Sequence, residues 1–185
     1  MSAVALIHDN ALSEYPLSED VGEMDSLNMK KHCIKGEKNA SFLPFPADTK
    51  TFILYHHEHA DGSGVFGMTS GKIPSGVQFI AAANWLDIDT NLLMVDTRKS
   101  LATVRMSIES KRGTVLTETV TDSLLSVLDL GLLYRLRDEN VDSALDKVMP
   151  EWNVNLPPPT MMRLAEFMAR IADYKSKFTF TECSK

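Results

Sequence analysis

The sequence lacks a basic excess, long apolar runs and closely spaced cysteines, and each absence excludes a class of function. Its 185 residues carry a formal net charge of -6, so the basic face needed to bind nucleic acid or an anionic membrane is not expected. No apolar run approaches the roughly 20 residues that cross a bilayer. Cys33 and Cys183 match no metal or redox spacing and are interpreted as reduced thiols. We therefore expect a cytoplasmic protein that binds neither nucleic acid nor membranes.

Histidine is missing from the last two thirds of the chain, because all five histidines lie between residues 8 and 59. The densest stretch, residues 56–64, reads His-His-Glu-His-Ala-Asp-Gly-Ser-Gly. Neutral imidazoles and carboxylates are good ligands for transition-metal ions. A single histidine is more often a hydrogen-bonded structural residue, so the metal prediction depends on the grouping.

Apolar residues recur every three or four positions through most of the chain, which is typical of amphipathic helices. No segment shows the strong alternation of a half-buried strand. We predict helices over these segments: residues 76–90, the regions Leu101 to Ile108 and Val120 to Leu128, residues 141–148, and Thr160 to Phe178. The expected fold class is therefore all-α, in a chain long enough to bury one core.

The predicted C-terminal helix carries an apolar stripe that needs a partner. It follows the run Pro157–Pro159, and its apolar residues are Leu164, Phe167, Ile171, Tyr174 and Phe178. The stripe is expected either to dock on the rest of its own chain or to form a homodimer with a second copy. Nothing in the sequence separates these two alternatives.

Three separate segments carry metal-capable side chains at or near predicted helices. They are His8–Asp9 after an apolar run, His32 within a helical stretch, and His56–His57 at the end of a short helix that starts near Thr49. Adjacent helical residues diverge by roughly 100°. His56 and His57 can therefore bind the same ion only if the end of the helix directs both rings to one point. Otherwise each ring binds a different ion.

These segments together resemble the HD-GYP family, a branch of the HD superfamily of metal-dependent phosphohydrolases. The family patterns and their matches are HDxGK with residues 8–12, a single histidine with His32, HHExxDGxGYP with residues 56–66, and GLxGxxIP with residues 67–74. The resemblance runs from about Val4 to Leu128. We therefore expect an HD-GYP-like helical bundle over residues 1–130, a short helix and linker over 131–156, and an amphipathic helix with a tail over 157–185.

The resemblance implies a centre with two or three divalent metal ions, iron or manganese, that hydrolyses cyclic di-GMP or a related phosphoester. Bound ions of this kind activate water and neutralise phosphate charge. The metal ligands implied are His8, Asp9, His32, His56 and His57, with Asn84 as a weaker sixth ligand. Asn84 stands where the family has an aspartate, and its amide oxygen brings no negative charge.

Further departures affect the groups that would hold the substrate. Leu12 replaces the lysine of HDxGK, and Val65 replaces the tyrosine of GYP, so no catalytic residue is assigned. The family's basic segment falls near residues 93–96, which hold no cation. Lys72 and Arg98 are the remaining candidates for binding substrate phosphates.

These departures predict a degenerate HD-GYP domain with weak activity or none. The family domain normally opens with another helix bearing His or Glu, whereas Met1 stands only seven residues before His8, so the resemblance implies an N-terminally shortened domain. The alternatives are a non-catalytic signalling module that contacts a diguanylate cyclase domain and a metal-binding nucleotide sensor for cyclic di-GMP.

Overall fold

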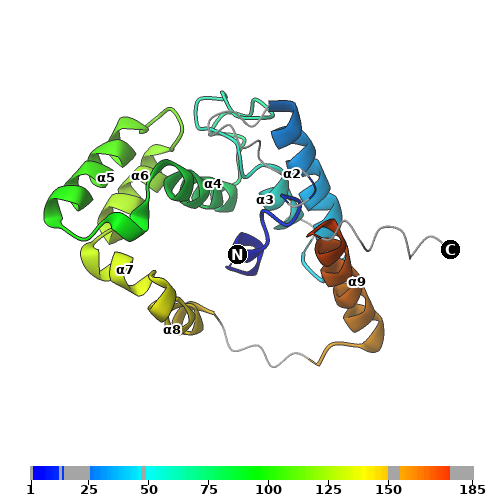
Figure 1. Cartoon of the computed structure of the whole chain (residues 1–185). Helices are drawn as coiled ribbons and strands as arrows, with labels where there is room; N and C mark the ends of the chain where they lie inside the picture. The colour runs from blue at the N-terminus through cyan, green and yellow to red at the C-terminus, as the bar shows by residue number, and fades with distance from the viewer. Residues whose placement is uncertain (1, 13, 15–25, 47–48, 150–154, 176–185) are drawn as a thin grey trace. The chain divides into compact units, whose positions relative to one another are not determined.

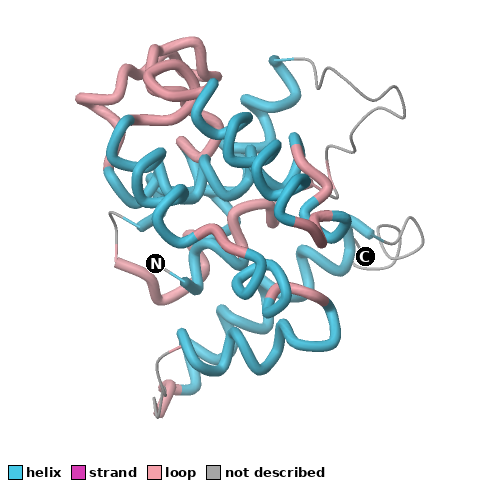
Figure 2. The backbone as a smooth tube through the Cα atoms, turned by 90° about the vertical axis from the view of Figure 1, so that its left-hand side faces the viewer, coloured by secondary structure: helices cyan, strands magenta, loops and turns pink. Residues whose placement is uncertain are grey.

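The computed structural model describes residues 2–12, 14, 26–46, 49–149 and 155–175, and these are mostly helical (Figure 1). In chain order the helices are α1 (Ser2–Leu6), α2 (Ser26–Ala40), α3 (Thr49–Leu54), α4 (Ser75–Asp89), the 3-10 helix η1 (Leu92–Met94), α5 (Arg98–Ser110), α6 (Glu118–Val127), α7 (Leu130–Arg135), α8 (Asp138–Val148) and α9 (Pro158–Lys175). Figure 2 shows them joined by loops, with no strand among the described residues. The all-α prediction is confirmed.

Contacts within the chain define two compact units. The first unit contains residues 3–57 together with α9, and the second contains residues 58–152. The domain boundaries expected at residues 130 and 156 stay a prediction. Among the described residues, no helix is long and apolar enough to cross a membrane.

Close packing of α2 against α3 forms the centre of the first unit. A Cβ atom added at Gly36 on α2 would lie 2.9 Å from Ile53 Cγ2 on α3, so this approach requires glycine. The inward face of α2 carries fully buried polar side chains, His32 and Asn39, whereas Ile34 is 47% exposed. Cys33 and Ala40 are also fully buried, so the buried face of α2 combines polar and small apolar residues, while its large apolar residues Leu27 and Ile34 are exposed.

Helix α9 docks on the chain that follows α2. Phe167 is buried, Arg163 Nη2 donates a hydrogen bond to Ser41 O at 2.7 Å, and the Arg170 guanidinium lies 4.2 Å from the Phe42 ring centroid. The helix begins at Pro158, two residues before the predicted start, because proline suits the first turn of a helix. Phe178 lies outside the described residues.

One face of α9 remains exposed and apolar, with exposed fractions of 59% for Met161, 38% for Leu164 and 61% for Met168. Packing of α9 within the chain thus buries Phe167 but leaves Leu164, the first residue of the predicted stripe, exposed. The homodimer through this helix stays a prediction.

The second unit has an apolar core built from α4 to α7. Its buried members are Ala82, Leu86, Val95, Val104, Ile108, Leu116, Val120, Leu128 and Leu133. Side chains cap several of these helices: Thr97 accepts a hydrogen bond from the backbone N–H of Ser100, and Thr117 accepts one from Val120. The predicted helix over 76–90 is confirmed as α4, but Ile88 is 75% exposed, whereas Leu86 in the same last turn is buried in the core.

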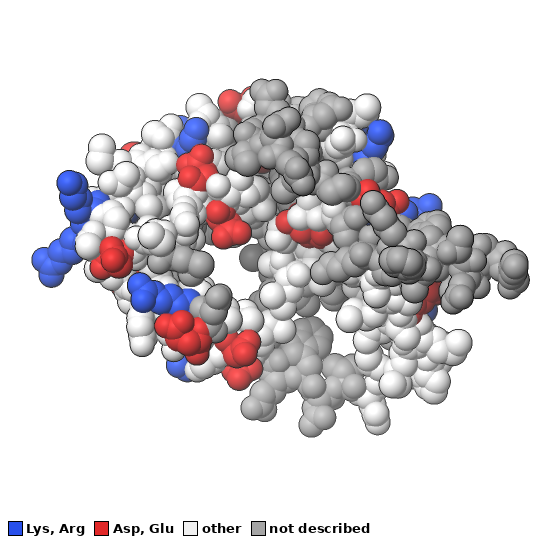
Figure 3. Space-filling model, in the orientation of Figure 1, with Lys and Arg blue, Asp and Glu red and all other residues white. Residues whose placement is uncertain are grey.

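Charged side chains on the drawn face are interspersed in sign (Figure 3). In the second unit, Arg112 forms ion pairs with Glu109 at 2.7 Å and with Asp122 at 2.8 Å. Exposed pairs of this kind contribute little to stability. The charge of Arg112 is thus balanced by neighbouring carboxylates and does not add to a basic surface.

Candidate metal centre

The first unit brings four predicted ligands together from three segments: Asp9, His32, His56 and His57, whose ligand atoms all lie within 4.8 Å of one another. Asp9 stands in the turns that follow the short helix α1, and His32 lies in the middle of α2. The two adjacent histidines lie in the turn that follows α3, after Tyr55. This helix end presents both rings to one cluster, one of the two arrangements left open by the sequence.

Three of these ligand atoms form a nearly equilateral triangle. Asp9 Oδ1 lies 3.0 Å from His32 Nε2 and 3.2 Å from His56 Nε2, and the two Nε2 atoms are 3.3 Å apart. Ligands bound to one transition-metal ion at about 2.1 Å are separated by about 3.0–3.5 Å at octahedral or tetrahedral angles. The triangle therefore has the dimensions of three ligands around a single ion.

The protonation of His56 can be assigned from its contacts. Its Nδ1 lies 2.6 Å from Ile53 O, and a carbonyl oxygen only accepts, so Nδ1 carries the hydrogen. Burial lowers the pKa of His56, which keeps the ring neutral. Its Nε2 then turns a lone pair toward the Asp9 carboxylate with no hydrogen between them, an arrangement that a cation would stabilise.

His57 completes the cluster as a further neutral imidazole. Its ring centroid lies 4.0 Å from that of His56. Burial, together with the nearby His56 and His32, lowers the pKa of His57 to about 2. Such a ring is unprotonated at neutral pH and offers a lone pair to a metal ion.

His8 contacts the other oxygen of the same carboxylate. Its Nδ1 lies 2.6 Å from Ala5 O, and its Nε2 lies 3.1 Å from Asp9 Oδ2. By the same argument as for His56, a neutral His8 ring donates from Nδ1 and presents the Nε2 lone pair to Asp9. The carboxylate is thus faced by imidazoles on both of its oxygens.

The negative charge of the cluster resides on Asp9. Burial raises the pKa of this carboxyl group, but hydrogen bonding, chiefly from the facing ring of His32 at 3.0 Å, outweighs burial and holds the pKa well below its usual range. Asp9 is therefore ionised at neutral pH. One carboxylate among neutral imidazoles is a suitable donor set for a divalent transition-metal ion.

The remainder of the histidine-rich stretch belongs to the second unit and has structural roles there. The buried Glu58 carboxylate accepts hydrogen bonds from the backbone N–H groups of Phe66 and Met68, which closes the loop between them. Gly62, with φ of +86°, provides a turn inside this loop. His59 Nδ1 lies 2.9 Å from Ser63 Oγ. His59 and Glu58 are therefore not part of the four-residue cluster.

Several other predicted site residues also lie in the second unit. Asn84 is on α4 and is partly exposed, Lys72 and Arg98 are exposed, and Val65 is partly buried in the loop. Neither unit by itself brings these residues to the cluster of the first unit. Their predicted roles in metal or substrate binding stay predictions.

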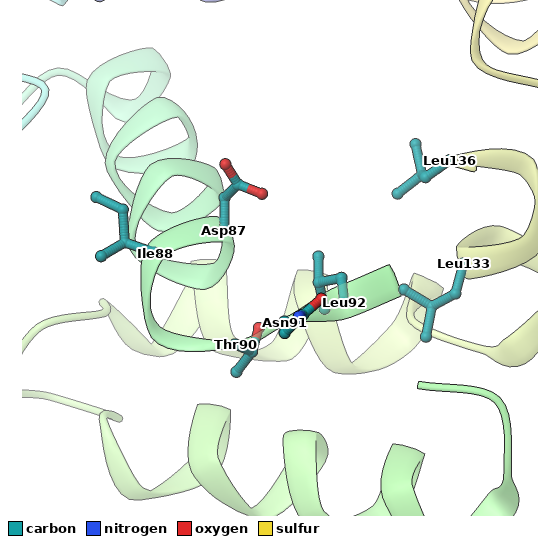
Figure 4. Close-up of a pocket in the computed structure, with 7 residues that line it drawn as sticks. All are labelled: Asp87, Ile88, Thr90, Asn91, Leu92, Leu133 and Leu136. Atoms are coloured by element: carbon teal, nitrogen blue, oxygen red, sulfur yellow. The ribbon is translucent and has the colours of Figure 1, made fainter. Parts of the chain in front are cut away.

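A pocket of about 580 Å³ in the second unit does not have the chemistry of a metal centre (Figure 4). It is lined by Asp87, Ile88, Thr90, Asn91, Leu92, Leu133 and Leu136. Figure 4 shows Asp87 on one side of the opening and Leu136 on the other. One carboxylate without an imidazole or thiol among the lining residues does not form a transition-metal site.

Sequence reasoning missed two residues that support the cluster. Asn10 is buried and hydrogen-bonds to α2, and Gly36 allows α2 to approach α3. Gly36 could have been noticed because it lies inside a predicted helix, where a glycine often indicates close packing against another segment. Asn10 gave no signal, since its partner is 26 residues away.

Comparison with known protein families, curated proteins and solved structures finds no match. The fold and the cluster thus define a helical protein with an Asp–His site that could hold a metal ion. This combination is compatible with a domain of the HD type.

Proposed function

We propose that this protein binds a divalent transition-metal ion, iron or manganese, through Asp9, His32, His56 and His57. The observation that carries the proposal is the triangle of ligand atoms with sides of 3.0, 3.2 and 3.3 Å. Neutral imidazoles with a single carboxylate suit such ions. His8, which faces the second carboxylate oxygen, supports the expectation that more than one ion binds.

The centre is proposed to be of the HD-GYP type and to act on a phosphodiester such as cyclic di-GMP. A bound ion would supply activation of water and neutralisation of phosphate charge. The chain's own contribution is to hold the ligands: Ile53 O fixes the tautomer of His56, and Ala5 O fixes that of His8.

Turnover is proposed to be slow because no lysine or arginine that could bind the substrate phosphate lies near Asp9 in the sequence. Leu12, in the same turn as Asp9, stands where the family has lysine and has no charge to offer. Lys35 of α2 forms an ion pair with Glu14 at 3.1 Å. Loss of one stabilising group for transition-state charge typically lowers kcat by about 10²–10³.

The proposal is tested by metal analysis of the purified protein and by a cyclic di-GMP hydrolysis assay with added Mn²⁺ or Fe²⁺. His56→Ala should abolish metal binding and any hydrolysis that is detected. His59→Ala is the matched control, because His59 belongs to the same sequence motif but hydrogen-bonds to Ser63 outside the cluster. Equal metal binding by wild type and His56→Ala would refute the proposed site.

The same measurements distinguish the alternatives raised by the sequence. Stoichiometric metal with cyclic di-GMP binding but no cleavage would favour the nucleotide sensor. Absence of both metal and hydrolysis would favour a signalling module that contacts a diguanylate cyclase domain. The cytoplasmic location and the homodimer through α9 belong to this proposal as well, and light scattering of purified protein tests the homodimer.

A further inference from the structure

Asn10 directly follows Asp9 and ties its turn to α2. The side chain is buried, with 8% of the residue exposed. Its Nδ2 donates one hydrogen bond to Ile7 O at 2.8 Å and another to Gly36 O at 3.2 Å. Both amide hydrogens are thus used, one within the turn and one across to the helix.

The acceptor on α2, Gly36 O, belongs to the same helix as the proposed metal ligand His32. Gly36 lies four residues after His32, so the two residues share one face of α2. A Cβ atom at Gly36 would lie 3.5 Å from Asn10 Nδ2 and 3.6 Å from His8 O. The hydrogen bond therefore joins the turn that carries Asp9 to the helical face that carries His32.

The turn itself needs such a connection. Asp9 follows α1, a helix of only five residues, and the next hydrogen bonds along the backbone are isolated turns at Asn10 and Leu12. Short helical segments of this kind have little stability of their own. The position of the Asp9 carboxylate therefore depends on contacts made by its neighbours.

We propose that Asn10 is a positioning residue that holds the Asp9 carboxylate in the metal-binding triangle with His32 and His56. This inference rests on the proposed metal-binding function. Asn10 itself uses its amide hydrogens on two carbonyl groups, so it acts through Asp9. Metal affinity then depends on a residue that has no contact with the ion.

The test measures Mn²⁺ affinity for wild type, Asn10→Leu and Asn10→Ala. Asn10→Leu keeps the branched shape of the side chain, with a somewhat larger volume, and removes both donors. Asn10→Ala removes the donors without adding volume and so shows whether leucine causes an effect of its own. Groups that orient metal ligands typically change affinity by about 10- to 100-fold, and both variants should lose affinity by that factor. Circular dichroism establishes that each variant is folded.

Asn39→Ala is the matched control. Asn39 is also a fully buried asparagine of the first unit, and its side chain has no hydrogen-bond partner among the residues that the structure describes. This control should keep the wild-type Mn²⁺ affinity and the wild-type visible absorption spectrum of bound Co²⁺. The Asn10 variants should change that spectrum, because the carboxylate ligand shifts.

A double substitution distinguishes positioning of Asp9 from a general effect on folding. In the Asp9→Ala background, Asn10→Leu should cause no further loss of Mn²⁺ affinity. Tight binding by wild type with unchanged binding by both Asn10 variants would overturn this inference alone, as would an equal loss in the Asp9→Ala background. A wild-type protein that binds no Mn²⁺ would overturn the proposed function and this inference with it.

Discussion

The substitution Gly36→Ala perturbs the junction where the three ligand-bearing segments meet. The added Cβ atom would lie 2.9 Å from Ile53 Cγ2, whereas carbon atoms pack best at about 3.5–4.0 Å. The helices α2 and α3 must therefore separate by several tenths of an ångström or more. Ile53 O accepts the hydrogen bond from His56 Nδ1, so this movement also displaces a proposed ligand from His32.

The magnitude follows from two opposing effects. Overpacking of a buried site costs about 1–3 kcal/mol, and replacing glycine by alanine within a helix contributes about 1 kcal/mol of stability. We expect the metal-free protein to lose about 1 kcal/mol of unfolding free energy as the balance of these terms. The larger effect should fall on Mn²⁺ affinity, which we expect to decrease about tenfold or more because the ligand triangle opens.

Urea unfolding in EDTA and Mn²⁺ titration measure the two quantities separately. The control is Gly71→Ala, because no atom lies within 4 Å of the added Cβ and the backbone there does not need glycine. If Gly36→Ala instead stabilises the protein and keeps wild-type Mn²⁺ affinity, α2 and α3 do not pack closely at Gly36. The inference that this packing holds the ligands would then be refuted.

Further predictions concern pH, catalysis and metal removal. His57 has a pKa of about 2 in the folded chain and an ordinary value of 6.5, so the unfolded chain binds more protons below pH 6.5 and stability falls on acidification. At pH 5 this residue alone should cost the metal-free protein about 2 kcal/mol relative to pH 8, measured by urea unfolding, and a flat profile would contradict its neutral burial. Leu12→Lys should raise cyclic di-GMP hydrolysis at least about tenfold by adding a cation beside Asp9, whereas Leu12→Met should not, and equal rates for the two variants would argue against a missing cation. EDTA should lower the thermal midpoint of metal-loaded protein, since free ion at 100 times Kd contributes about 2.7 kcal/mol, and an unchanged midpoint would indicate that folding and metal binding are not linked.

The sequence predicted those features that depend on local spacing. Helices α4 and α8 form over the segments predicted from apolar spacing, although the last apolar residue of each predicted period, Ile88 and Val148, is exposed. The set of clustered ligands was also predictable, since imidazole and carboxylate groups are recognisable by type. The ligand atoms of Asp9, His32 and His56 lie within 3.3 Å of one another because three separate segments pack together. The residue types alone do not predict this closeness, which the sequence indicated only through the family resemblance.

Contacts between distant residues explain what the sequence left out. The buried face of α2 is polar at His32 and Asn39, so an apolar period could not locate it. Glu58 looked like part of a ligand group, but it accepts hydrogen bonds from backbone groups eight and ten residues later. The bond from Asn10 to Gly36 likewise depends on how two segments pack.

The proposed metal centre is tested most directly by the Mn²⁺ stoichiometry and affinity of wild type, His56→Ala and His59→Ala under identical conditions. His56 has its lone pair directed at the Asp9 carboxylate at 3.2 Å, and His59 hydrogen-bonds to Ser63 in the other unit. We expect stoichiometric binding by wild type and His59→Ala and loss of binding in His56→Ala. Equal binding by all three proteins, or weaker binding only in His59→Ala, would contradict this expectation.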